Sequence, residues 1–74
     1  MGNLDSAVIE KAAQVLRTVA HPKRIEIINL LVQHKRLSVG EIRELLDLTQ
    51  SMTSQHLAAL RSVEVVSFQK EANI

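Results

Sequence analysis

Hydrophobic residues recur with helical spacing in the first part of the chain. They stand at i, i+4, i+7, i+8 and i+11, the stripe of an amphipathic helix. The stripe consists of Val8, Ala12, Val15, Leu16 and Val19. Asp5 or Ser6 can cap its free N–H groups, so we expect a helix from about Ser6 to Val19. Ile9 and Ala13 widen its apolar face, which predicts two contacts, one with the core and one with another chain.

A second hydrophobic segment begins at His21-Pro22 and runs to about His34. Proline suits the first turn of a helix, because the N–H group that it lacks has no partner there. Apolar residues on most sides of a helix are typical of burial at the centre of a domain. They are Ile25, Ile27, Ile28, Leu30, Leu31 and Val32. The isoleucines would also suit a strand, but the length and the proline favour a helix.

A third helix has the clearest start signal. Ser38 and Glu41 have the S-x-x-E spacing of a capping box, and Leu37 with Ile42 is placed for a hydrophobic staple. The residues expected to face the core are Ile42, Leu45 and Leu46. A tight turn at residues 47–48 then leads to a fourth helix capped by Thr49. Its expected core face is Thr53, Leu57 and Leu60.

After about Val63 the pattern changes, and β-branched and aromatic residues favour an extended strand from Val65. We expect no second strand before the chain ends at Ile74. Together the elements predict one mainly α domain of the α+β type over residues 1–74. It would contain four helices followed by one strand, without a second strand to pair with it.

The start of the fourth helix carries short hydrogen-bonding side chains in place of the Lys and Glu usual on exposed helices. They are Thr49, Gln50, Ser51, Thr53, Ser54, Gln55 and His56. In a helix-turn-helix, the second helix enters the major groove with its N-terminal residues against base edges. Glutamine can pair with adenine, and serine or threonine can reach bases or phosphates. We therefore predict a DNA-reading unit, although a plain helical hairpin could also carry a polar face.

The residues expected to contact DNA fall into two groups. Those at the start of the fourth helix are Gln50, Ser51, Thr53, Ser54, Gln55 and His56, of which Thr53 also suits the core. Arg61, Lys23 and Lys70 are expected to contact phosphates, which position a protein without reading sequence. The net charge is only +1, but positive residues concentrate between residues 17 and 36. Such a run also fits an ordinary solvated face.

Composition argues against several other functions. The chain has no cysteine, which excludes disulfides and thiolate metal sites. His21, His34 and His56 fall on three elements without helical pairing, so we expect no metal site and no cofactor. The sequence contains no discernible nucleophile–base pair or Gly-rich phosphate loop, so we expect that the protein is not an enzyme. No apolar run is long enough to span a bilayer, and no signal peptide is visible, so we expect a cytoplasmic protein without a membrane partner.

Three motifs together resemble a known family. They are L-R-x-x-A-H-P-x-R-x-x-I-x-x-L-L at residues 16–31, L-S-V-G-E-I at 37–42, and L-x-Q-S-x-x-S-Q-H-L-x-x-L-R-S-V-x-V-V at 48–66. Their order and spacing resemble the ArsR/SmtB group of bacterial winged-helix repressors. The resemblance implies a homodimer that binds an inverted-repeat operator in double-stranded DNA and represses transcription. It maps the dimer interface onto residues 6–19, the recognition helix onto residues 49–62, and the start of the wing onto Val65.

The chain departs from the metal-sensing members of that group. Those members carry Cys-x-Cys in the third helix, where this chain has Ser38-Val39-Gly40-Glu41. Other members bind zinc through a last helix that we do not expect here. Two alternatives stay open beside the DNA-binding regulator. One is a protein-interaction or dimerisation module without DNA binding, which the low net charge favours. The other is a metal or ligand sensor whose histidines come from both subunits.

Overall fold

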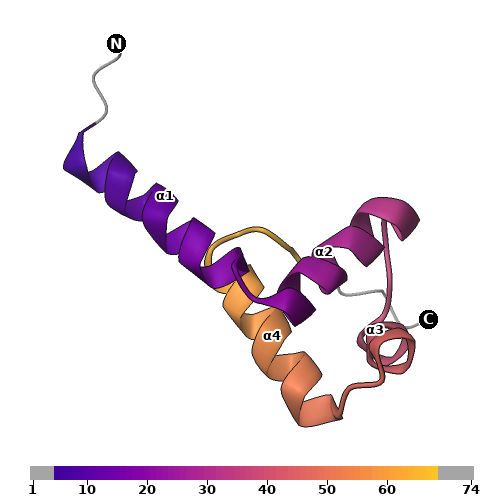
Figure 1. The fold of residues 1–74 in the computed structure, drawn as a ribbon. Coiled ribbons are helices and arrows are strands. Elements are labelled where there is room, and N and C mark those ends of the chain that lie inside the picture. The colour runs from indigo at the N-terminus through magenta and orange to yellow at the C-terminus, as the bar shows by residue number, and fades with distance from the viewer. Residues whose placement is uncertain (1–4, 69–74) are drawn as a thin grey trace.

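The computed structural model describes residues 5–68 of the chain. These residues form four helices: α1 (Ser6–Val19), α2 (Pro22–His34), α3 (Val39–Leu46) and α4 (Gln50–Ser62). Helices α2, α3 and α4 pack against one another, whereas α1 extends away from them and contacts α4 near one end (Figure 1). The helices predicted from the hydrophobic pattern are confirmed, and their order is that of a helix-turn-helix domain.

Side chains at the predicted positions cap the helices. Asp5 Oδ1 accepts the Val8 N–H of α1 at 2.9 Å. At the start of α3 the Glu41 N–H donates to Ser38 Oγ at 3.0 Å, and the Ser38 N–H donates to Glu41 Oε1 at 2.8 Å. This reciprocal pair is the predicted capping box. Hydrogen bonds from the backbone and side chain of Ser38 also lower the pKa of the Glu41 carboxyl.

The core lies where α2, α3 and α4 meet. Four aliphatic side chains at its centre are almost fully buried: Ile27, Ile42, Leu57 and Leu60. Partly buried hydrophobic residues pack around them, among them Val19 from the end of α1, Leu37 before α3, and Val66 after α4. Burying one such side chain contributes roughly 1.5–3 kcal/mol, so this small cluster carries much of the stability of the domain.

Several hydrophobic residues expected in the core are exposed. Helix α2 is not surrounded on all sides, because α3 and α4 cover only one of its faces, and Ile25 and Val32 on the other are 52% and 72% exposed. Leu45 was expected to face the core but is 55% exposed. Helix α3 has only eight residues, and Ile42 and Leu46, four positions apart, supply its buried stripe. Leu45 lies beside that stripe.

The strand expected from Val65 is not formed by the residues that the structure describes. Helix α4 ends in a Schellman motif, in which Glu64 takes a left-handed conformation with φ 63°. The Glu64 N–H donates to the Arg61 carbonyl at 2.9 Å, and the Val65 N–H donates to the Leu60 carbonyl at 3.0 Å. The Val65 N–H is therefore already hydrogen-bonded to the end of the helix. Within residues 5–68 no neighbouring strand is present. The rest of the expected wing lies outside the described residues.

Helix α1 is the least buried element. None of its residues is buried, and Val8, Ile9 and Leu16 are 50%, 54% and 69% exposed. Of the two contacts predicted for its wide apolar face, the described chain makes only the one with the core, through Val19 at its C-terminal end. No described helix is long and apolar enough to cross a membrane.

Two isoleucines of α2 test the position of the core. Ile27 is fully buried, whereas Ile25, two positions earlier, is 52% exposed. We expect Ile27→Ala to lower the free energy of unfolding by about 2–5 kcal/mol, since it removes buried methyl groups and leaves a cavity. The matched variant Ile25→Ala should cost less than about 1 kcal/mol. Urea denaturation followed by circular dichroism measures both, and equal losses would contradict the packing described.

Candidate nucleic-acid interface

The turn between α3 and α4 is fixed by backbone hydrogen bonds. Asp47 takes the left-handed conformation with φ 53°, which Asp tolerates better than most residues. Its N–H donates to the Glu44 carbonyl at 3.3 Å, and the Leu48 N–H donates to the Arg43 carbonyl at 3.0 Å. These two bonds make a second Schellman motif, which closes α3. Thr49 then caps α4 by accepting the Met52 N–H at 3.1 Å. The two helices are thereby held in a helix-turn-helix.

The inner face of α4 is built into the core. Thr53, Leu57 and Leu60 are at most 3% exposed, which confirms the core face predicted from their spacing. The Thr53 hydroxyl donates to the Thr49 carbonyl at 2.8 Å, so its polar atom has a partner inside the protein. His56 is 7% exposed. The expectation that Thr53 and His56 contact DNA is therefore corrected, because burial keeps both side chains from a groove.

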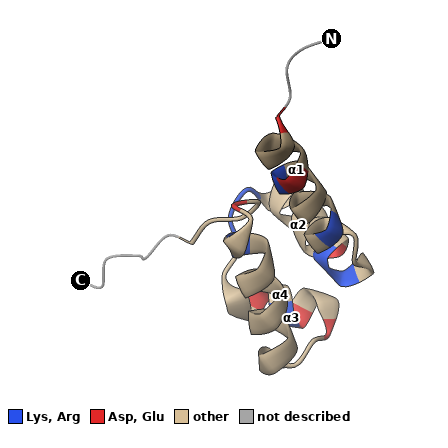
Figure 2. Ribbon diagram, turned by 90° about the vertical axis from the view of Figure 1, so that its left-hand side faces the viewer, with Lys and Arg blue, Asp and Glu red and all other residues tan. Residues whose placement is uncertain are grey.

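The outer face of α4 presents the remaining candidates together. Gln50, Ser51, Ser54 and Gln55 are exposed on its first half, and Met52 is 44% exposed beside them. None of the four polar side chains forms a hydrogen bond within the described residues. Figure 2 shows charged residues on α1, α2 and α3, whereas most of α4 carries none. The result is a neutral surface of amide and hydroxyl groups at a helix N-terminus.

The phosphate candidates lie elsewhere. Arg61 is in the last turn of α4, about 16 Å along the helix from Gln50 at 1.5 Å per residue. Its guanidinium carbon lies 5.2 Å from the centre of the Phe68 ring. Lys23, at the start of α2, forms a surface ion pair with Glu26 at 3.2 Å. Lys70 lies outside the described residues.

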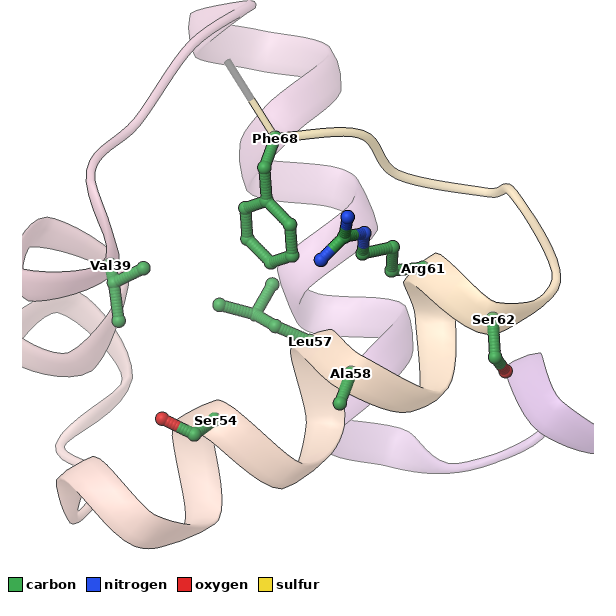
Figure 3. Close-up of a pocket in the computed structure, with 7 residues that line it drawn as sticks. All are labelled: Val39, Ser54, Leu57, Ala58, Arg61, Ser62 and Phe68. Atoms are coloured by element: carbon green, nitrogen blue, oxygen red, sulfur yellow. The ribbon is translucent and has the colours of Figure 1, made fainter. Parts of the chain in front are cut away.

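A groove of about 440 Å³ runs along one side of α4 (Figure 3). Ser54, Ala58 and Arg61, at i, i+4 and i+7, follow its length, so Ser54 and Arg61 share one side of the helix. Its remaining lining is Val39, Leu57, Ser62 and Phe68. The groove thus connects the neutral first half of α4 with the positive charge of Arg61 at its end. Such a surface suits a ligand that has polar groups and a negatively charged backbone.

A polar cluster behind α4 was missed by the sequence analysis. Arg24 Nε donates to His56 Nδ1 at 3.2 Å, and Arg24 Nη1 donates to the Thr18 carbonyl at 2.9 Å. The His21 and His56 rings lie 4.7 Å apart between centroids, at a tilt of 59°. His21 and His56 thus meet although they stand on separate elements. The three-residue spacing of His21 and Arg24 at a helix start was the available signal, since it places both on one face.

The environment of His56 opposes a positive charge. Burial is the largest cause that lowers the pKa of its imidazole, followed by the charges of His21 and Arg24. Among residues 5–68 no group of three or more His, Cys, Asp or Glu side chains is placed to hold a metal ion. A site assembled from the histidines of two subunits stays a prediction.

Comparison with known proteins relates the chain to one family. Residues 21–67 match the model described as bacterial regulatory protein, arsR family. The chain is 47% identical over 53 residues to the transcriptional repressor PagR of Bacillus anthracis, which covers 72% of this chain and 54% of PagR. It is 38% identical over 66 residues to the HTH-type transcriptional regulator YgaV of Escherichia coli, covering 89% of this chain and 67% of YgaV.

A third relative is the transcriptional activator HlyU of Vibrio cholerae, 44% identical over 62 residues, which covers 84% of this chain and 56% of HlyU. The chain therefore spans about half to two thirds of the length of these relatives. No solved structure matches it.

The lowered pKa of His56 predicts acid-sensitive stability. The folded state favours the neutral imidazole, so the contribution of His56 is fully present above its ordinary pKa of 6.5. It is lost as the pH falls below that value and through the folded-state pKa. We expect the melting temperature to drop between about pH 7.5 and about pH 5.5, and to drop less in His56→Gln. His34→Gln, at an exposed histidine of α2, is the matched control and should follow the parent. Identical pH profiles for the parent and His56→Gln would refute the prediction.

Proposed function

The chain belongs to the arsR family of bacterial regulatory proteins, and from that premise we propose that it is a sequence-specific DNA-binding regulator of transcription. One observation carries the proposal: the exposed first half of α4, directly after the helix-turn-helix turn, presents four neutral hydrogen-bonding side chains and no charged one. A major groove is read by such groups at the N-terminus of a recognition helix. The family is one of regulatory proteins rather than enzymes.

Base reading is assigned to the exposed polar residues of α4. Gln50 and Gln55 can each form two hydrogen bonds to an adenine, whereas Ser51 and Ser54 can reach bases or phosphates. Arg61 is proposed as a phosphate contact, because it follows Ser54 on one side of the helix. Lys23 and Lys70 stay proposed as phosphate contacts that orient the protein without reading sequence.

The proposed regulator acts as a homodimer through α1. Three hydrophobic side chains of α1 are at least 50% exposed. Their exposure to water is unfavourable, and a second copy of the chain would cover them. A two-fold axis through such a pair would place the recognition helices about 34 Å apart, one turn of DNA, so the operator is an inverted repeat. Among the relatives PagR is named a repressor and HlyU an activator. We propose that this protein represses transcription, because PagR is the more similar of these two relatives. We further propose that it acts in the cytoplasm.

The exposed face of α1 also favours a second candidate function. The same surface would suit a protein-interaction module that docks a different protein and has no DNA role. The net charge of +1 agrees with that alternative, because a DNA-binding domain usually carries a larger positive charge.

Selection from a random pool of duplex DNA, followed by sequencing, tests the proposal. Enrichment of an inverted repeat with half-sites about 10 base pairs apart, centre to centre, is the expected result. Enrichment of no sequence by a folded protein would overturn the proposal in favour of the interaction module.

On the selected operator, Gln55→Ala should weaken binding by on the order of 1–3 kcal/mol and relax the base preference at one position of each half-site. The reason is that alanine removes both hydrogen-bonding groups of the amide. Gln33→Ala, at an exposed glutamine of α2, is the matched control and should bind as the parent does. Fluorescence anisotropy on operator and random duplexes measures the effect. Equal losses on both duplexes would remove Gln55 from the base-reading set.

Dimerisation predicts a strong effect of charge on α1. Leu16 is 69% exposed, and we expect Leu16→Glu to shift the protein from dimer to monomer, since burying an unpaired carboxylate costs several kcal/mol. Val32→Glu, at a site 72% exposed on α2, should leave the dimer intact. Analytical ultracentrifugation measures both. A parent protein that sediments as a monomer, or a dimer insensitive to Leu16→Glu, would place the interface elsewhere.

A further inference from the structure

We propose that Arg24 and His56 are positioning residues that set the spacing between the two half-sites of the operator. Arg24 bridges the end of α1, the proposed dimer helix, and the inner face of α4, the proposed recognition helix. The inference rests on the proposed function and goes beyond it, because it assigns a role in DNA binding to two residues that do not face DNA.

The bridge consists of two hydrogen bonds from one guanidinium. Nη1 donates to the Thr18 carbonyl at 2.9 Å, and Nε donates to His56 Nδ1 at 3.2 Å. A guanidinium is planar, so the directions of its two donors are fixed relative to each other. The Thr18 carbonyl and the His56 ring are therefore held in one mutual arrangement. Because Thr18 belongs to α1 and His56 to α4, the same bonds fix the end of one helix against the side of the other.

Pro22 makes the Thr18 carbonyl available. In a continuing helix this carbonyl would accept the N–H of the residue four positions later, which is Pro22, and proline has no N–H. The break between α1 and α2 thus leaves an acceptor that Arg24, two residues after the proline, satisfies. The H-P-x-R sequence at residues 21–24 supplies both the break and the group that spans it.

Little else restrains the direction of α1. It has no buried residue, and within the described chain it packs against α4 and, through Val19, against the core. In Figure 1 it projects from the other helices as an arm attached at one end. A small change in the angle between α1 and α4 would displace each recognition helix relative to the two-fold axis. Since both subunits change alike, the separation of the two recognition helices would change by twice the displacement.

The bridge requires neutral His56. Its Nδ1 accepts from Arg24, whereas a protonated imidazole carries N–H donors on both nitrogens and cannot accept. The groups that face His56 are His21 from the turn before α2 and Arg24 from α2, while α1 contributes the uncharged Thr18 carbonyl. A proton on His56 would therefore meet the charge of Arg24 directly, and the lowered pKa of His56 agrees with that arrangement. Acid should break the same bridge that a mutation breaks.

A positioning role can be separated from a structural one. If Arg24 only stabilised the fold, its loss would weaken binding to every operator by one factor. If Arg24 sets the helix separation, its loss changes the ratio of affinities between operators whose half-sites are moved apart or together. The readout is that ratio.

The experiment uses the full chain and the selected operator, with its two half-sites moved by one or two base pairs in either direction. The variants are Arg24→Lys, which keeps the charge but lacks the planar fork, and His56→Gln, which does not titrate. Arg17→Lys is the matched control, at an exposed arginine of α1 outside the bridge. Circular dichroism first confirms that each variant is folded.

A coupling between two sites of a protein typically changes an affinity by about 5- to 150-fold. We therefore expect the parent to bind the operator with the preferred spacing roughly tenfold more tightly than the others at about pH 7.5. Arg24→Lys should reduce that preference to about twofold while Arg17→Lys keeps it. As the pH is lowered from about 7.5 through the lowered pKa of His56, the unmodified parent should lose its preference as Arg24→Lys does, and His56→Gln should keep one preference throughout.

Two results overturn the inference. One is an equal loss of affinity at every spacing in Arg24→Lys, and the other is a spacing preference of the parent that does not respond to pH. Failure of the proposed function has a different signature, since the parent would then enrich no inverted repeat at all and no spacing could be compared.

Discussion

The burial of one stripe of α4 is the constraint on which the rest of the structure depends. Thr53, Leu57 and Leu60 are packed against α2 and α3, and a helix has 3.6 residues per turn. Once these three face inward, the rotation of α4 about its axis is set, and Ser51, Ser54 and Gln55 must face outward. Gln50 lies on the side of Leu57, seven positions later, and is exposed because it is the first residue of the helix. The chemistry of the outer surface is therefore a consequence of hydrophobic packing on the opposite face.

The helix ends are fixed by short-range polar contacts that complement this packing. Left-handed residues at Asp47 and Glu64 close α3 and α4, and their amide groups and those of the next residues satisfy carbonyls that would otherwise lack partners. Among the described residues no buried side-chain nitrogen or oxygen lacks a hydrogen-bond partner. A small aliphatic core tolerates few unsatisfied groups, since each costs roughly 1–3 kcal/mol.

The junction between α1 and the other helices is built differently. Val19 packs against the core and the Arg24 bridge joins the end of α1 to α4, whereas Val8, Ile9 and Leu16 of α1 are exposed to solvent. A domain of this size buries only a modest fraction of its surface and gains from association. The exposed face of α1 suits a partner, and under the proposed positioning role the Arg24 bridge would determine the direction in which that partner is held.

Local structure was determined by the sequence itself. Three features depend only on residues within about one to three helical turns, so the spacing of residues in the sequence predicts them. They are the bounds of α1 and α2, the Ser38–Glu41 capping box, and the core stripe of α4. Tertiary structure alone decided which faces have neighbours. It exposed Ile25 and Leu45, buried His56, and within residues 5–68 gave Val65 no strand to pair with. It also brought Arg24 to His56 across 32 positions of sequence, a contact that no local period encodes. The physical reason is that burial and long-range hydrogen bonds depend on how whole helices pack, whereas caps and stripes depend only on the helix that contains them.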